Sequence, residues 1–343
     1  MRISMAVILL LFSQLLAAAT EGELSTGLVN PGYHEKPDWF KESFLDLRED
    51  VQEAAAQNKR VMLYFYQDGC PYCAKLLKDN FGNLQIEKKV RRHFDVIAIN
   101  LWGDREVVSL DGQATTEKQF AESLKVQYTP TLLFLDEQGK VVVRLNGYYE
   151  PDKFDVVLNY IAGKHEKEMK LSAYYKQHRA AAGAGKLNDE PFFLHHPLRL
   201  ADNRRQSWRP LLVLFEQPGC KPCDELHHDS FRREPVVLAL SAFDVAQVNL
   251  DSDEPLQTPD GRVMLARQWA EELGLQYAPG MVYFDSDGKE VFRSEAWLKA
   301  FHLHAVLDYV ATGAYRHQPN FQRFVQHRAE MMRAKSFAVD LMK

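Results

Sequence analysis

The four cysteines of the chain form two C-x-x-C pairs, Cys70 with Cys73 and Cys220 with Cys223. A disulfide between residues three positions apart closes almost no loop, so it restrains the unfolded chain very little. Secreted proteins that depend on disulfides for stability space their cysteines more widely. Pairs this close are therefore typical of chemistry, either thiol–disulfide exchange or metal binding.

A C-x-x-C pair at the start of a helix brings both sulfur atoms onto one face. Residues three apart on a helix have Cα atoms about 5 Å from each other, a separation that a disulfide tolerates. Free backbone N–H groups and the helix dipole stabilise a thiolate at the leading position and lower its pKa. We therefore expect Cys70 and Cys220 to act as nucleophiles, and Cys73 and Cys223 to resolve the mixed disulfide.

An x-Pro pair follows each cysteine pair by about sixty residues and precedes a hydrophobic stretch: Thr129-Pro130 in the first case and Ala278-Pro279 in the second. A proline at that place is unusual in a strand. A cis bond there would expose the residue before proline beside the sulfurs, where the backbone of a substrate could bind. Thr129, Pro130, Ala278 and Pro279 are the predicted substrate-binding residues.

Zinc sites also use the C-x-x-C spacing, but zinc takes four ligands and neither half of the chain contains a second such pair. His227 and His228, shortly after Cys223, could join a Cys/His site. Adjacent histidines point to different sides of a helix, however, and they are interpreted here as part of a solvated helix face. No metal ligand and no cofactor is predicted.

The two cysteine pairs lie in two copies of one unit. Cys220 follows Cys70 by 150 residues, and the later matches occur at an offset of 149. The later matched positions include Asn100/Asn249, Tyr128/Tyr277, Gly139/Gly288, Tyr160/Tyr309 and His178/His327. So many matches at nearly one offset indicate a duplicated domain, because the period is too long for a solenoid repeat.

The residue pattern predicts the same order of elements in each copy. For the first copy the predicted segments are helices over 40–58, 74–94, 116–125 and 152–162 and strands over 60–66, 95–101, 131–135 and 140–145. A helix over 165–179 precedes an Ala/Gly-rich break at 180–185, and an equivalent helix near 320–332 closes the second copy. The fold class is α/β, with a central mixed sheet flanked by helices in each copy.

Four stretches of the first copy carry a family resemblance over about residues 36–165. They are Gly69-Cys70-Pro71-Tyr72-Cys73, Leu101-Trp102-Gly103-Asp104-Arg105-Glu106-Val107, Tyr128-Thr129-Pro130-Thr131 and Asn146-Gly147-Tyr148. With them the chain resembles the thioredoxin superfamily, most closely the periplasmic thioredoxins of the SoxW type. The resemblance implies two tandem thioredoxin folds, redox-active disulfides, a cis-proline at Pro130, protein thiols as substrates and a membrane electron donor of the DsbD or CcdA type.

The chain departs from this family six residues before each leading cysteine. Typical thioredoxins carry a buried aspartate there, which assists proton removal from the resolving cysteine. This chain carries Tyr64 and Leu214 instead, so the base for the resolving cysteines is not identified. The second copy also has Gly280 after its proline, and we expect its substrate groove to differ from the first.

The first 19 residues have the pattern of a secretory signal: Arg2, an apolar run over 5–16, and small residues at 17–19. The run is shorter than the ~20 apolar residues of a membrane span, and no later segment is long and apolar enough for one. We therefore expect export to the periplasm and no stable membrane insertion after cleavage. The formal net charge of −5 gives no basis for nucleic-acid binding.

The predicted domains are a signal peptide at 1–19, a first thioredoxin-like domain at 36–180, a linker at 181–205 and a second domain at 206–332. The predicted function is an exported thiol–disulfide oxidoreductase, a reductase that exchanges disulfides with exported proteins through both cysteine pairs. Two alternatives remain open: a copper- or zinc-binding thiol chaperone, and a redox-inactive interaction module.

Overall fold

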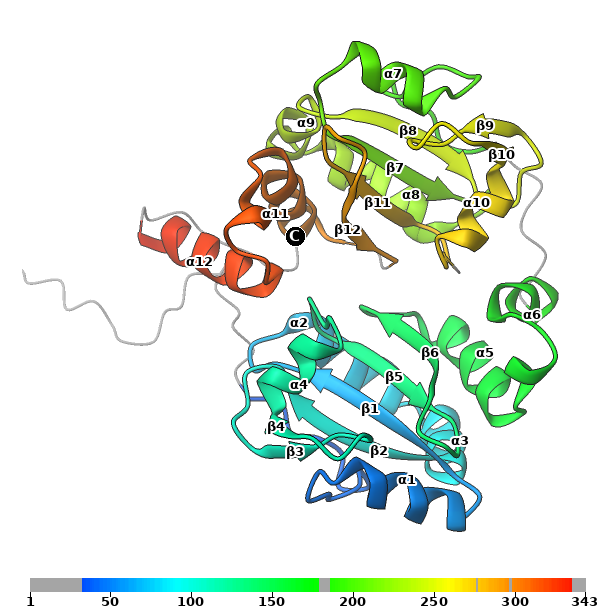
Figure 1. Ribbon diagram of the computed structural model, residues 1–343, viewed down its shortest axis with the longest axis vertical. Helices are drawn as coiled ribbons and strands as arrows, with labels where there is room; N and C mark the ends of the chain where they lie inside the picture. Colours follow the sequence, from blue (N-terminus) through cyan, green and yellow to red (C-terminus); the bar gives the residue numbers. More distant parts are fainter. Residues whose placement is uncertain (1–32, 179–185, 276, 296–297, 335–343) are drawn as a thin grey trace, which may run out of the picture.

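The computed structural model describes residues 33–178, 186–275, 277–295 and 298–334. The signal peptide expected at 1–19 and the first part of the expected linker, 181–185, lie outside these ranges. Within them the chain forms two α/β domains of the same topology, the first in blue to green and the second in green to red (Figure 1). None of the helices in these ranges is both long enough and apolar enough to cross a membrane.

The first domain is built on a four-stranded sheet of order β2-β1-β5-β6. Its elements are α1 (Leu47–Ala56), β1 (Arg60–Tyr66), α2 (Pro71–Lys75), the π-helical segment η1 (Leu76–Phe81), α3 (Leu84–His93), β2 (Phe94–Asn100), β3 (Glu106–Val108), β4 (Ala114–Thr116), α4 (Glu117–Ser123), β5 (Thr131–Leu135), β6 (Val141–Asn146), α5 (Pro151–Ala162), η2 (His165–Lys167) and α6 (Leu171–His178). Strand β1 runs parallel to β2 and antiparallel to β5, which pairs antiparallel with β6. The predicted mixed sheet is confirmed.

The second domain repeats this arrangement in a sheet of order β12-β11-β7-β8. Its elements are α7 (Leu200–Gln206), β7 (Leu211–Glu216), α8 (Lys221–His228), η3 (Ser230–Arg232), α9 (Glu234–Leu240), β8 (Asp244–Asn249), β9 (Pro255–Gln257), β10 (Val263–Leu265), α10 (Ala266–Glu272), β11 (Gly280–Phe284), β12 (Glu290–Ser294), α11 (Ala300–Ala311), η4 (Ala314–Arg316) and α12 (Phe321–Ala334). In the range expected to be linker, Phe193 forms a β-bridge with Val245 of β8.

Helices cover both faces of each sheet. Side chains alternate along β1, so Tyr64 packs with residues of α3 and α5, whereas Leu63 and Phe65 pack with residues of α1 and α4. Such two-sided burial explains why β1 is a nearly continuous apolar run. It also holds the end of β1, and thus the loop that follows it, on a rigid base.

The single helix expected over 74–94 is wrong. Segment η1 ends at Phe81, and a new helix starts after Asn83. The Asn83 side chain accepts hydrogen bonds from the N–H groups of Gln85 and Ile86, as an N-cap residue does. The hairpin of β3 and β4 was not predicted either, because strands of three residues are too short for a clear alternation.

The two domains pack against each other through matching elements. The hydroxyl of Tyr128 in the first domain donates to the backbone carbonyl of Arg293 in the second, at 3.2 Å. Tyr277, the counterpart of Tyr128, packs in turn on Tyr149 and Tyr175 of the first domain, with ring centroids 4.7 and 5.0 Å apart. Helices α6 and α12 lie at opposite ends of this interface (Figure 1). The packing is therefore reciprocal.

Candidate active sites

Each disulfide lies where the central strand of a sheet turns into a helix. Gly69 and Gly219, which follow β1 and β7, have φ angles of 75° and 71°. Glycine adopts this left-handed region without the steric cost that a side chain would add. The turn lets Cys70 and Cys220 take the N-cap positions of α2 and α8.

At both sites the leading sulfur accepts a backbone hydrogen bond from the residue that resolves it. The N–H of Cys73 donates to Sγ of Cys70 at 3.0 Å, and the N–H of Cys223 donates to Sγ of Cys220 at 3.2 Å. Each pair is joined as a disulfide with Cα atoms 5.2 Å apart. The same N–H groups would stabilise the leading sulfur as a thiolate once the disulfide is reduced.

Both x-Pro pairs lie directly before the strand that pairs with the central one. The Thr129–Pro130 and Ala278–Pro279 peptide bonds are cis, as the resemblance implied for Pro130. Sγ of Cys70 lies 3.4 Å from the carbonyl oxygen of Thr129. The structure thus brings the predicted substrate-binding backbone of the first domain to its disulfide.

Cys70 opens onto a cavity of about 340 Å³ between the two domains. Its walls include Trp102, Tyr128 and Tyr148 from the first domain and Phe292, His302 and Gln322 from the second. Close in sequence to Cys70, the hydroxyl of Tyr72 accepts a hydrogen bond from the N–H of Lys299 at 3.0 Å. The Tyr72 ring packs on the ring of His302, with the two centroids 5.2 Å apart. Burial raises the pKa of Tyr72 and lowers the pKa of His302 to about 4, so both are neutral at pH 7.

The second site contacts the first domain through its cis-proline loop. Nζ of Lys153, on α5, donates to the carbonyl oxygen of Ala278 at 3.5 Å. Burial lowers the pKa of Lys153. The carbonyl oxygens before the two cis-prolines thus have different neighbours: a cysteine sulfur at Thr129 and a lysine at Ala278.

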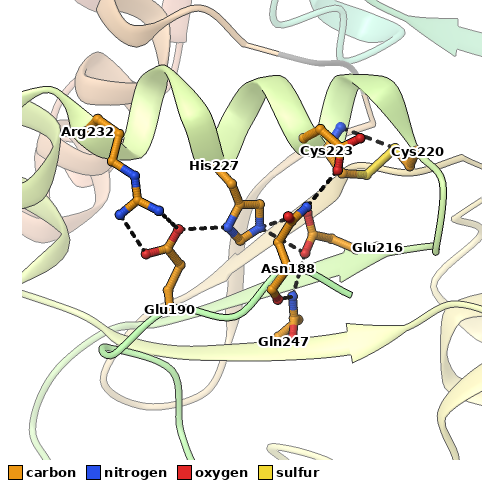
Figure 2. Close-up of polar contacts among 9 residues, drawn as sticks. Asn188, Glu190, Glu216, Cys220, Cys223, His227, Arg232 and Gln247 are labelled. Carbon is orange, nitrogen blue, oxygen red and sulfur yellow. Dashed lines mark hydrogen bonds and ion pairs between the residues drawn. A yellow bond between two sulfur atoms is a disulfide. The ribbon is translucent and has the colours of Figure 1, made fainter. Parts of the chain in front are cut away.

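A buried network of charged side chains underlies the second disulfide (Figure 2). Nδ1 of His227 lies 2.9 Å from Oε1 of Glu190, and Nε2 lies 3.1 Å from both carboxylate oxygens of Glu216. The three side chains are each 1% exposed. The interpretation of a solvated helix face is therefore wrong for His227, whereas His228 is exposed.

Two further groups complete the network. The guanidinium of Arg232 donates to both carboxylate oxygens of Glu190, at 2.7 and 3.0 Å, and Nε2 of Gln247 donates to Glu216 at 2.6 Å. Burial alone would lower the pKa of His227, but hydrogen bonds and charges from Glu216 and Glu190 outweigh it and raise that pKa. Since both ring nitrogens face carboxylates, which only accept hydrogen bonds, the imidazolium form fits this site.

The sequence contains a signal for this network, although the cysteine and proline motifs do not include it. Glu216 ends an otherwise apolar buried strand, two residues after Leu214, on the same face of the sheet. His227 lies four residues after Cys223, and residues four apart on a helix are neighbours. Among the described residues, no group of three or more His, Cys, Asp or Glu has an arrangement that could hold a metal ion.

A family profile described as "Thioredoxin-like domain" matches the chain twice, over residues 47–162 and 201–311. The chain is also similar to curated proteins named "Thiol:disulfide interchange protein DsbD". The one from Photorhabdus laumondii is 28% identical over 117 residues, which are 33% of this chain and 19% of that protein. The one from Pseudoalteromonas atlantica is 28% identical over 111 residues, 32% of this chain and 17% of that protein. The match thus spans about a fifth of the length of these relatives.

Solved structures that resemble parts of the chain include the following two. A thioredoxin-fold protein from Helicobacter pylori is 26% identical with a TM-score of 0.31, and the match covers 35% of this chain and 84% of that one. A thioredoxin from Thermus thermophilus is 23% identical with a TM-score of 0.29, and the match covers 40% of this chain and 95% of that one.

Proposed function

The chain belongs to the thioredoxin-like family and is a thiol–disulfide oxidoreductase, and from that premise we propose that it is an exported reductase of protein disulfides. The observation that carries the proposal is the N-cap position of both leading cysteines, each with its sulfur bonded by the N–H of its partner. A disulfide that closes so short a loop adds little stability, so stability does not explain why both copies have this arrangement.

The exchange begins when the reduced leading cysteine, Cys70 or Cys220, attacks a substrate disulfide as a thiolate. One substrate sulfur leaves as a thiolate and the other stays bound to the leading cysteine. Cys73 or Cys223 then loses its proton and attacks the leading sulfur, so the enzyme disulfide closes and the second substrate sulfur leaves. Two electrons pass from the enzyme dithiol to the substrate.

The backbone at Thr129-Pro130 and Ala278-Pro279 receives the substrate chain in this proposal. The carbonyl of Thr129 already lies next to Sγ of Cys70. Residues of the second domain, among them Phe292 and His302, form part of the wall around this place, and Cys70 is 2% exposed. A protein substrate therefore reaches Cys70 when the two domains separate, whereas a small disulfide reaches it through the cavity.

In this proposal, a membrane protein of the DsbD or CcdA type donates electrons to the chain on the periplasmic side of the membrane. The similarity to proteins named thiol:disulfide interchange proteins supports an exchange partner of this class. The secretory pattern of residues 1–19 supports the periplasm as the compartment. The SoxW-type resemblance supports the reducing direction.

An insulin-reduction assay on the full chain tests the proposal. We expect the wild type to reduce insulin with dithiothreitol as the electron source, Cys70→Ser and Cys220→Ser each to lose part of the rate, and the double variant to lose all enzyme-dependent rate. Circular dichroism of each variant shows whether it is folded. A folded wild type that reduces no insulin, but carries stoichiometric copper or zinc when reduced, would overturn the proposal in favour of a thiol chaperone.

A further inference from the structure

The buried network of the second domain is not needed to build its fold. The first domain has the same topology, yet Tyr66 and Leu77 occupy the positions that match Glu216 and His227. Burying charged groups is costly, and apolar replacements of buried ion pairs are often neutral or stabilising. Three buried ionisable groups, Glu190, Glu216 and His227, in only one of two duplicated domains therefore call for a role other than stability.

The network lies on the inner side of the resolving cysteine. Cys223 and His227 are both 1% exposed and lie on one face of α8, four residues apart. Glu216 ends β7, four residues before Cys220, and its carboxylate reaches His227 from the sheet. Figure 2 shows Glu216 below the disulfide, between strand and helix. Because Cys223 is 1% exposed, its sulfur is shielded from bulk solvent, and the ionisable side chains beneath it are the candidate acceptors of its proton.

We propose that the Glu216–His227 pair takes the proton that Cys223 loses when the second disulfide closes and returns that proton when the disulfide opens. This rests on the proposed function, since it concerns the resolving step of the same site. On closing, the S–H bond of Cys223 breaks, its proton passes to the pair, and its thiolate attacks Sγ of Cys220. The bond from Cys220 to the substrate sulfur breaks, and the substrate leaves as a thiolate.

Glu190 and Arg232 are positioning residues for this transfer. Glu190 holds Nδ1 of His227, and Arg232 balances the charge of Glu190. The charged and titratable groups on the elements around the pair include Glu190 before α7, Arg232 on η3, Lys299 before α11, and four residues of α8: Lys221, Asp224, Glu225 and His228. Asp224 accepts from the amide of Asn188, and Glu225 pairs with Lys299 on the outer side of α8. With His227 as the imidazolium, the positive charges of Arg232 and His227 balance the negative charges of Glu190 and Glu216.

The test measures the resolving step of the second site alone. It uses the full chain with Cys70→Ser and Cys73→Ser, which is called the background protein below. The reduced protein is mixed with a dithiobis(nitrobenzoate) reagent, and released thionitrobenzoate is followed by its absorbance from pH 5.5 to 9. Attack by Cys220 releases the first equivalent, and ring closure by Cys223 releases the second. In the background protein we expect the rate of the second release to reach its plateau at a pH below the ordinary thiol pKa of about 8.5.

Glu216→Gln and His227→Gln should each slow the second release by about a hundredfold at pH 7, the lower end of the range for general acid–base assistance. Their pH profile should move towards that of an unassisted thiol, and the first release should change much less. His228→Gln, at the exposed neighbouring position, is the matched control and should behave like the background protein. Thermal unfolding of the oxidised variants checks that they are folded.

The outcomes separate the two proposals. Absence of the first release would overturn the proposed function of the second site. A normal first release, with a second release of unchanged rate and pH profile in Glu216→Gln and His227→Gln, would overturn the proton transfer alone. If neither variant folds, the pH profile of the background protein still tests the proton transfer. A rate of second release that rises with a midpoint near pH 8.5, as for an ordinary thiol, contradicts assistance by the pair.

Discussion

In both domains the N–H of the resolving cysteine donates a hydrogen bond to the leading sulfur, but the groups beneath the two disulfides differ. Below Cys223 lie a histidine and two carboxylates, whereas the matching positions near Cys73 hold Leu77 and Tyr66. Proton removal from Cys223 has buried ionisable groups nearby, and proton removal from Cys73 does not have their counterparts. At the residue scale, the two sites are therefore expected to titrate differently.

The charged state of His227 predicts a specific pH dependence of stability. Its folded pKa is raised above the unfolded value of about 6.5. The stabilisation is therefore fully present below about pH 6.5 and is lost as the pH rises through the folded pKa. His227→Gln should destabilise the oxidised protein by about 3 kcal/mol at pH 6, as expected for a broken buried pair, and by less at pH 9. Thermal unfolding at both pH values measures the difference; a destabilisation that stays constant or grows with pH contradicts it.

At the scale of elements, the break between η1 and α3 depends on one cap. Asn83 satisfies two N–H groups at the start of α3. Asn83→Ala should lower the free energy of unfolding of this domain by about 1 kcal/mol, whereas Asn83→Asp, which retains a capping oxygen, should not. Hydrogen exchange of the α3 amides measures the effect, and equal protection in the two variants would show that the cap is unimportant.

The sequence predicted those elements whose pattern is local. Strand 60–66 is found at its predicted ends, because six apolar or aromatic residues follow Arg60 and a polar turn comes after them. The prediction of one helix over 74–94 failed because apolar residues recur at helical spacing on both sides of Gly82-Asn83 and hide the break. The role of His227 was missed since it depends on Glu190, 37 residues away, and on the fold that brings the two together.

At the scale of the whole molecule, the duplication produced two domains that pack together so that the second lines the cavity at the disulfide of the first. The ring of Tyr277 is buried on the first domain, and Gln67 donates to Gln322 at 3.1 Å across the cavity. Access to Cys70 is therefore linked to the strength of this interface. Lys153 at the second cis-proline loop gives that site a contact of its own with the first domain.

Weakening the interface should expose Cys70. Tyr277→Ala removes a ring packed on Tyr149 and Tyr175, so the domains should separate more often. We expect the reduced variant to react faster than wild type at Cys70 with a polyethylene-glycol maleimide, and to gain much less with small iodoacetamide. Trp208→Ala, which removes an aromatic ring that is 91% exposed, is the control. Equal rates of bulky labelling in Tyr277→Ala and wild type would show that the interface does not limit access.

The most direct test of the account is the reduction potential of each cysteine pair. The full chain is equilibrated in glutathione or dithiothreitol redox buffers, free thiols are alkylated, and the state of each pair is read by peptide mass spectrometry. We expect both pairs to titrate as reversible two-electron couples at potentials above about −300 mV, as exchange-active disulfides do. If Cys70–Cys73 and Cys220–Cys223 instead stay oxidised down to the potentials of structural disulfides, the account of two exchange sites is wrong.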